Sequence, residues 1–261
     1  MHIALVQIAI ETQRRSANLV RALDWIDKAC DLDPCPDLVV LPACCDIGWL
    51  PDGAPDLADP VGGPFVESLA AKAREMGIHL VAGVNETEAG SLYVAALLFD
   101  PDGDILLRQR MIDPTAASRS TDGCYASGTR LEVRQTSWGC VGLSVATEDG
   151  EDCLTGALGA MGADLVVAPA AWASDRGRRD AAASTIRERV AAIVTARPTA
   201  LVLANAVGEI DDGAWSGRAF CGGSLAFGPD GRELLVGSSV EQGMLSVEIE
   251  LANEASPKRR T

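Results

Sequence analysis

The sequence predicts an α/β fold, because short apolar runs typical of buried strands alternate with segments whose apolar residues recur at helical spacing. The clearest unit spans residues 141–173, with the sequence VGLSVATEDGEDCLTGALGAMGADLVVAPAAWA. Segments 141–145 and 164–169 are apolar runs that predict strands, and the stretch between them has helical periodicity. Open α/β sheets place ligands where a strand ends and a helix begins, so we expect the functional site near residues 145–148.

The composition favours one large domain without affinity for polyanions. The chain has 261 residues, of which 48% are hydrophobic, enough for a substantial core. It has 22 basic and 37 acidic residues, a net charge of −15. This charge argues against nucleic acid and against anionic membrane surfaces as partners.

The terminal segments and the cysteines predict a cytoplasmic protein without a metal. No charged leader precedes the first apolar run, and no apolar run is long enough for a membrane span. The eight cysteines contain no CxxC pair, a usage typical of a reduced compartment. With only two histidines, the sequence favours neither a zinc site nor a catalytic histidine, and we expect no metal and no cofactor.

The remaining elements follow in order along the chain. Apolar runs predict strands at 2–10, 37–42, 78–84, 92–100, 105–110, 131–135, 140–145, 164–169, 199–205, 224–227, 233–237 and 244–251. Apolar stripes predict helices around 19–26, 65–76, 154–161 and 186–193, the first with Ser16 as its N-cap. Residues 51–64 predict a surface loop, and the turns at 100–103 and 228–231 predict two hairpins.

Three motifs carry a resemblance to a known superfamily. The first motif of this superfamily runs V-G-x-x-I-C-Y-D, continues through a helix and ends G-A-D-L-x-x-x-P-x-x-W. This chain matches it at Val141, Gly142, Val145, 162–165, Pro169 and Trp172. Its P-E-x-x-x-x-G-[YW] is matched at Pro42, Gly48 and Trp49, and its A-N-x-V-G at 204–208. The chain thus resembles the nitrilase, or carbon–nitrogen hydrolase, superfamily. The resemblance implies a four-layer α-β-β-α sandwich, with one nitrilase-like domain over 1–251 and a C-terminal tail at 252–261.

The resemblance also implies where a catalytic triad would lie, and all three positions depart from the pattern. The glutamate, lysine and cysteine positions of the family fall on Ala43, Met111 and Ala146. Hydrolysis of an amide or nitrile by this family needs a carboxylate to move a proton, an ammonium to stabilise charge and a thiolate to attack. In a studied protease, losing the nucleophile alone costs on the order of a million-fold in turnover. We therefore expect no hydrolysis by the family mechanism.

Several other residues near these positions are candidates for lining a pocket. They are Cys44, Cys45, Trp49, Glu148, Trp172 and Asn205. At most one of the two adjacent cysteines can face a pocket if the backbone is extended, and core filling is the favoured role for both. Glu148 could bind a cation or an amine, or could simply place negative charge at a helix N-terminus. The tryptophans fit a pocket wall and a packed core equally well.

The leading hypothesis is a catalytically inactive pseudoenzyme that acts as a binding or partner subunit. We expect a homo-oligomer, with an active hydrolase or pathway enzyme as a possible partner and a small amide- or carboxylate-bearing molecule as a possible ligand. Two alternatives stay open. One is a repurposed enzyme that uses Cys44, Cys45 or Glu148. The other is an ordinary amidase-like carbon–nitrogen hydrolase whose triad lies in a different register.

Overall fold

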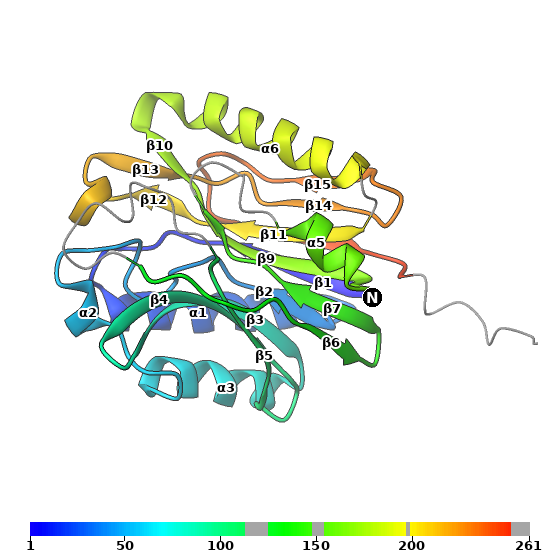
Figure 1. The fold of residues 1–261 in the computed structure, drawn as a ribbon, viewed down its shortest axis with the longest axis horizontal. Coiled ribbons are helices and arrows are strands. Elements are labelled where there is room, and N and C mark those ends of the chain that lie inside the picture. The colour runs from blue at the N-terminus through cyan, green and yellow to red at the C-terminus, as the bar shows by residue number, and fades with distance from the viewer. Residues whose placement is uncertain (113–124, 148–153, 197–198, 252–261) are drawn as a thin grey trace, which may run out of the picture.

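Two β-sheets lie face to face in the computed structural model, and helices cover both outer faces (Figure 1). The structure describes residues 1–112, 125–147, 154–196 and 199–251. The layers follow the order helix, sheet, sheet, helix, which confirms the predicted α-β-β-α sandwich. The prediction of one domain over 1–251 stays a prediction, and the tail at 252–261 lies outside the described residues.

The first sheet is built mainly from the N-terminal half of the chain. Its strands are β1 (His2–Gln7), β2 (Leu38–Val40), β3 (His79–Glu88), β4 (Ser91–Phe99), β5 (Ile105–Arg110) and β16 (Gly243–Glu248), in the order β16-β1-β2-β3-β4-β5. β1, β2 and β3 are parallel, and the other three join antiparallel. Helices α1 (Arg15–Cys30) and α3 (Pro64–Met76) cover its outer face (Figure 1).

The second sheet holds the unit that organises the sequence. Its strands are β6 (Val133–Thr136), β7 (Gly139–Leu143), β8 (Ala146–Thr147), β9 (Leu165–Ala171), β11 (Ala200–Asn205), β14 (Leu225–Phe227) and β15 (Glu233–Val236), in the order β15-β14-β11-β9-β7-β6 with β8 beside β9. β7, β9 and β11 are parallel. Helices α5 (Thr155–Ala160) and α6 (Arg179–Ala196) cover its outer face (Figure 1), so the predicted strand–helix–strand unit is confirmed.

Alternation along the central strands explains their continuous apolar sequences. In β11, Ala200, Val202 and Ala204 belong to the apolar cluster that includes the first sheet. Leu201 and Leu203 belong to a second cluster, which also contains the buried residues of α6. Successive side chains of a strand point to opposite faces, and here both faces are covered. Every residue of β11 is therefore buried.

A small third sheet and three short helical segments were not predicted. β10 (Ala173–Asp175), β12 (Val207–Glu209) and β13 (Arg218–Cys221) form a three-stranded sheet in the order β10-β13-β12. These strands are three or four residues long and carry charged side chains at their ends, so they lack the apolar run that identifies a buried strand. The structure also has short 3₁₀ turns η1 (Arg176–Arg178) and η2 (Gly213–Trp215). The predicted loop at 51–64 contains a short helix, α2 (Ala54–Leu57).

The first helix begins earlier than predicted. The carbonyl of Arg14 accepts the first helical hydrogen bond, from Asn18 N at 2.9 Å, so α1 begins at Arg15 and the prediction of Ser16 as N-cap was wrong. The buried face of the helix also differs from the predicted stripe, because Ala22 and Ile26 are fully buried whereas the leucines at 19 and 23 are only half-buried.

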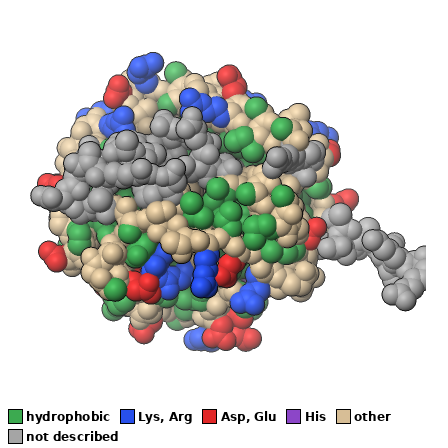
Figure 2. Space-filling view, in the orientation of Figure 1, with side chains coloured by type: hydrophobic (Ala, Val, Ile, Leu, Met, Phe, Trp, Pro, Cys, Tyr) green, Lys and Arg blue, Asp and Glu red, His purple; other side chains and the backbone are tan. Residues whose placement is uncertain are grey.

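An ion cluster lies on strands β3 to β5 at the surface. The carboxylate of Glu86, only 1% exposed, contacts both Arg108 and Arg110. Arg110 also contacts Glu88 at 2.8 Å and lies over the ring of Tyr93, 3.5 Å from its centroid. Figure 2 shows basic and acidic side chains next to each other on this face. Since both arginines contact carboxylates, the cluster stabilises the strands and does not form a purely basic surface.

Substitution of Gly83 tests how closely the first sheet approaches the segment after β2. A Cβ on Gly83 would lie 2.5 Å from Ala43 Cα and 3.0 Å from Pro169 Cβ, so Gly83→Ala forces backbone apart. We expect a loss of about 1 to 3 kcal/mol in the free energy of unfolding, measured by urea denaturation. The matched control is Gly177→Ala, where a Cβ meets nothing within 4 Å. Equal stability of the two variants would contradict the close approach.

Candidate functional site

The candidate site is organised by the loop that follows β2, residues 41–50, which we call the site loop. Its backbone alternates between the two sheets: Ala43 N donates to the carbonyl of Ala170 in β9 at 3.0 Å, and Cys45 N donates to the carbonyl of Gly83 in β3 at 2.9 Å. Ala146 is the register partner of the same Ala170. Two of the three triad positions of the resemblance therefore meet at one residue of β9.

The third triad position lies one residue after β5. Met111 N donates to the carbonyl of Val94 at 2.8 Å, and Val94 pairs with Asn85 of β3. The side chains of Ala43 and Ala146 are fully buried, and that of Met111 is 1% exposed. The structure thus places small or apolar, buried side chains at all three positions, at the end of the strands where the sequence placed the site.

A buried polar network lies beside these positions, and sequence reasoning missed it. Asn85 Nδ2 donates to Asp46 Oδ1 at 2.7 Å and to the carbonyl of Gly48 at 3.0 Å. Tyr125 Oη donates to Asn85 Oδ1 at 2.5 Å and accepts from Leu50 N at 2.9 Å. Asp46 could have been noticed as a carboxylate inside an apolar motif. The roles of Asn85 and Tyr125 have no local sequence signal, because their partners lie far away in the chain.

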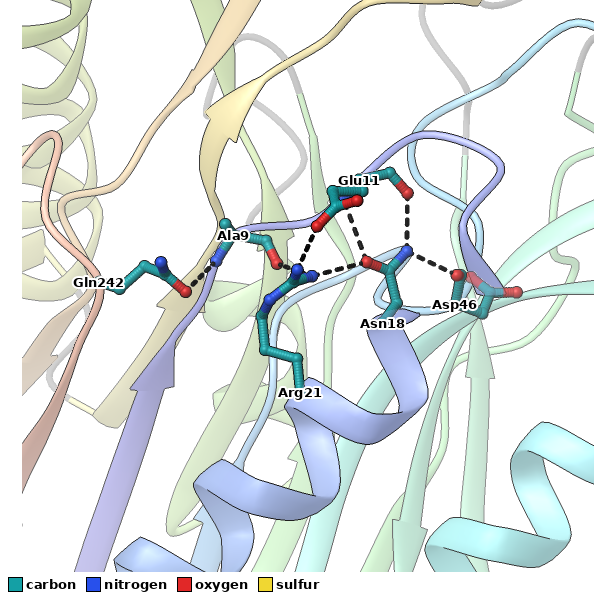
Figure 3. Close-up of polar contacts among 6 residues, drawn as sticks. All are labelled: Ala9, Glu11, Asn18, Arg21, Asp46 and Gln242. Atoms are coloured by element: carbon teal, nitrogen blue, oxygen red, sulfur yellow. Dashed lines mark hydrogen bonds and ion pairs between the residues drawn. The ribbon is translucent and has the colours of Figure 1, made fainter. Parts of the chain in front are cut away.

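Helix α1 holds the site loop from the other side (Figure 3). Asn18 Nδ2 donates to the carbonyl of Asp46 at 2.8 Å and to that of Glu11 at 2.7 Å. Arg21 donates to Asn18 Oδ1 and to the carbonyl of Ala9, both at 3.0 Å, and contacts the Glu11 carboxylate. Figure 3 shows these side chains converging between the end of β1 and the site loop. The helix therefore fixes the site loop against the segment that leaves β1.

Burial sets the protonation of the groups in the site loop. It raises the pKa of Asp46 from 3.8 to about 6, against the opposing effect of its hydrogen bonds from Asn85. Burial, reinforced by the charge of Asp46, holds the pKa values of the Cys44 and Cys45 thiols well above their ordinary value. Both thiols are fully buried and stay protonated at neutral pH, although Cys44 Sγ lies 3.9 Å from Tyr125 Oη. Neither is placed as an activated nucleophile.

Aromatic rings close over the network. Trp49, 1% exposed, stacks on Trp215 with ring centroids 4.7 Å apart and contacts Tyr125 at 4.9 Å. The site loop that carries Trp49 contains backbone in the left-handed region at two non-glycine residues, Cys44 (φ 53°) and Leu50 (φ 41°). Such conformations are costly and persist only where the surrounding contacts fix them. The site loop is therefore held in one rigid form.

Trp172 and Asn205 form a second buried unit. Asn205 Oδ1 accepts from Trp172 N at 2.9 Å, and its Nδ2 donates to the carbonyl of Gly222 at 2.7 Å. Both residues are at most 1% exposed. The amide of Asn205 thus links the residue that follows β9 to the residue that follows β13. The role of these residues in a pocket stays a prediction, and Glu148 lies outside the described residues.

Two searches among the described residues bear on metal binding and on membrane insertion. No group of three or more His, Cys, Asp or Glu side chains there could hold a metal ion. None of the helices in the described ranges combines the length and the apolar character that crossing a bilayer requires.

The pKa of Asp46 predicts a pH-dependent stability. The folded pKa of about 6 exceeds the unfolded value of 3.8, so the folded protein holds the proton of Asp46 more tightly than the unfolded chain does. The contribution of this protonated carboxyl to the free energy of unfolding is therefore fully present below about pH 4 and is lost as the pH rises through about 6. Asp46→Asn removes this titration. The difference in the free energy of unfolding between the variant and the wild type should shift in favour of the variant by on the order of 2 to 3 kcal/mol across this window.

The measurement is urea denaturation of both proteins at closely spaced pH values from 4 to about 7. Asp24→Asn, in an exposed i,i+4 pair with Lys28, is the control and should follow the wild-type curve in shape. A constant difference between Asp46→Asn and wild type at every pH would contradict the raised pKa.

Comparison with known proteins agrees with this architecture. The family model described as "Carbon-nitrogen hydrolase" matches residues 2–259. An aliphatic nitrilase of Sinorhizobium fredii is 35% identical over 143 residues, which are 52% of this chain and 44% of that enzyme. Nitrilase 3 of Arabidopsis thaliana is 35% identical over 111 residues, 42% of this chain and 32% of the relative. The matched segments thus span less than half the length of these curated relatives.

Solved structures show the same fold. A mutant of the Nesterenkonia AN1 amidase from the nitrilase superfamily superposes with a TM-score of 0.80 at 24% identity, covering 96% of this chain and 90% of that chain. The amidase after removal of its His-tag gives a TM-score of 0.80 at 23% identity. Since the family model spans nearly the whole sequence and the fold agrees with it, the chain belongs to the carbon–nitrogen hydrolase family of the nitrilase superfamily.

Proposed function

We propose that the protein is a non-catalytic member of its superfamily that acts as a binding or partner subunit. The observation that carries the proposal is the set of side chains at Ala43, Met111 and Ala146, which are all buried. A methyl or thioether group can neither move a proton nor attack a carbon atom, and none of the three can supply a positive charge. Membership of the family gives the fold, whereas function must follow from the site.

The same substitutions make the site stable without its ancestral charges. A buried carboxylate and ammonium need each other as partners, and removing only one of them leaves an uncompensated charge in the core. Replacing all the charged groups with apolar ones avoids that penalty. Three concerted replacements therefore fit the conversion of a catalytic site into core better than an isolated loss does.

A repurposed enzyme is the second candidate, because the curated relatives are named as nitrilases and thiols occur in the site loop. The left-handed backbone of Cys44 (φ 53°) favours this candidate, because residues with strained backbone cluster at functional sites. Burial opposes it, because both Cys44 and Cys45 are fully buried and protonated at neutral pH. We therefore rank it below the non-catalytic hypothesis.

Two indole groups support a ligand as part of the proposal. The Nε1 atoms of Trp49 and Trp172 are buried and have no hydrogen-bond partner among the residues that the structure describes. Burying a hydrogen-bond donor without a partner lowers the stability of the folded protein, and a carboxylate or amide oxygen would supply that partner. These donors fit the small amide- or carboxylate-bearing molecule expected from the sequence. The proposal further includes a homo-oligomer in the cytoplasm, with an active hydrolase or pathway enzyme as a possible partner.

Assay of hydrolysis tests the non-catalytic hypothesis. The purified protein, incubated with a panel of short amides, ureido acids and nitriles, should release no ammonia above the background, since loss of a nucleophile alone costs on the order of a million-fold in turnover. An active nitrilase assayed in parallel serves as the control. Native mass spectrometry of the same preparation reports a copurified subunit or small molecule.

Two further results would reject the proposal. The first is ammonia release by the wild type that alkylation of its thiols abolishes. The second is loss of that release in Cys44→Ser or Cys45→Ser but not in Cys221→Ser, a buried thiol bonded to the Trp172 carbonyl in the second unit. Either result would make an active enzyme the better hypothesis, and the second would identify its nucleophile.

A further inference from the structure

A cavity of about 280 Å³ lies between helix α6 and the small sheet, and none of the residues that line it belongs to the site loop. Strands β10 and β13 supply one wall, with Ala173 and Arg218. Helix α6 supplies the other wall with Ala182, Ile186 and Arg189, which follow each other at helical spacing and so share one face of the helix. The volume is close to the lower limit for small-molecule sites, so the cavity fits a small ligand.

The charge of this cavity differs from that of the whole protein. Three arginines line it, Arg178, Arg189 and Arg218, and Asp175 is the single carboxylate among the described residues of its lining. Three positive side chains and one negative one leave a net charge of +2. The whole chain carries a net charge of −15. A small molecule with two negative charges is therefore attracted to this cavity and repelled by most of the remaining surface.

The three arginines lie at two ends of the cavity. Arg178 and Arg218 both adjoin Asp175, because Arg178 follows it three residues later in the chain and Arg218 is its register partner across the β10–β13 pair. Arg189 lies in the third turn of α6, about 15 Å along the helix axis from the first residue of the helix. The positive charges are therefore separated, with mainly small or apolar side chains of α6 between them.

We infer that this cavity binds a small molecule that has a carboxylate at each end, one held by Arg178 and Arg218 and the other by Arg189. A guanidinium group is planar and presents parallel N–H donors that match the two oxygens of a carboxylate. Two carboxylates also balance the net charge of the described lining. The inference does not depend on the proposed function, because it uses no residue of the site loop.

The neighbouring arginines already have carboxylate partners, whereas Arg178 does not. Arg176 Nη2 lies 2.9 Å from Glu209 Oε2. Arg187 Nε lies 2.6 Å from Glu233 Oε2. Arg178 is exposed and forms no ion pair with any residue in the part of the chain that the structure describes. Its positive charge is thus free to act on a ligand in the cavity.

Arg218 connects the cavity to the aromatic rings over the site loop. Its guanidinium carbon lies 5.5 Å from the centroid of the Trp215 ring, and Trp215 stacks on Trp49 with ring centroids 4.7 Å apart. The guanidinium and the indole interact electrostatically in this arrangement. A carboxylate that binds Arg218 changes the electric field at the indole, so tryptophan fluorescence reports occupation of the cavity.

Titration calorimetry of the full chain with malonate, succinate, glutarate, adipate and pimelate tests the inference. Affinity should rise with the length of the dicarboxylate, because a longer molecule reaches both ends of the cavity. Adipate should bind at least about tenfold more tightly than hexanoate, which has the same number of carbon atoms and one carboxylate. Adipate should also change the tryptophan fluorescence of the wild type.

Arginine variants locate the bound dicarboxylate. Arg178→Gln and Arg189→Gln should each weaken adipate binding about tenfold, since each removes charge-assisted hydrogen bonds to one carboxylate. Both side chains are exposed, so we expect these variants to fold. Arg187→Gln is the matched control on the same helix, and it should bind adipate like the wild type because Arg187 pairs with Glu233 and does not line the cavity.

Four results would overturn the inference. The first is absence of adipate binding to the wild type, or binding without a change in tryptophan fluorescence. The second is equal affinity for malonate and pimelate, or for adipate and hexanoate. The third is adipate binding that Arg189→Gln leaves unchanged. The fourth is binding of inorganic phosphate as tight as that of adipate, because it would show a site for any anion.

Discussion

The structure depends on one constraint, which is that the site loop must satisfy its buried backbone while crossing between two sheets. Ala43 bonds to β9 and Cys45 bonds to β3, and the side chains of Asn18 and Asn85 bind the loop from α1 and from the first sheet. Buried peptide groups without partners are costly, so these bonds determine the conformation of the loop. The carboxyl of Asp46 belongs to the same arrangement, and burial raises its pKa to about 6.

The sequence predicted what periodicity and local turns encode. Continuous apolar runs identified β9 and β11, and α3 ends where the predicted stripe over 65–76 ends, at a left-handed Gly77 (φ 65°). The small sheet was missed because its strands are short and partly charged. The contacts of Tyr125 with Asn85 were missed because they join residues 40 positions apart, and no local pattern reports such a pairing. The motifs indicated the segment around Pro42 and Gly48, whereas the hydrogen-bond network of Asp46, Asn85 and Tyr125 could be found only in the fold.

Catalytic sites in folds of this kind combine a rigid scaffold with charged groups that the scaffold holds out of water. In this protein the scaffold remains, with a strained site loop and stacked aromatic rings at the ends of the strands. Ala43 and Met111 have joined the main apolar cluster, and Ala146 has joined the second one. These features stabilise a core here, which is the arrangement that the proposed non-catalytic function requires.

The rate at which Cys44 and Cys45 are alkylated in the native protein tests this account most directly. If the site loop is a closed part of the core, both thiols should react only when the whole domain unfolds, and their rates should rise with urea in proportion to the global unfolding equilibrium. Quantitative peptide mapping after timed alkylation gives the rate for each cysteine. Rapid alkylation of either thiol at neutral pH without urea would contradict the account, because it would reveal an accessible and activated sulfur where the structure has a buried, protonated one.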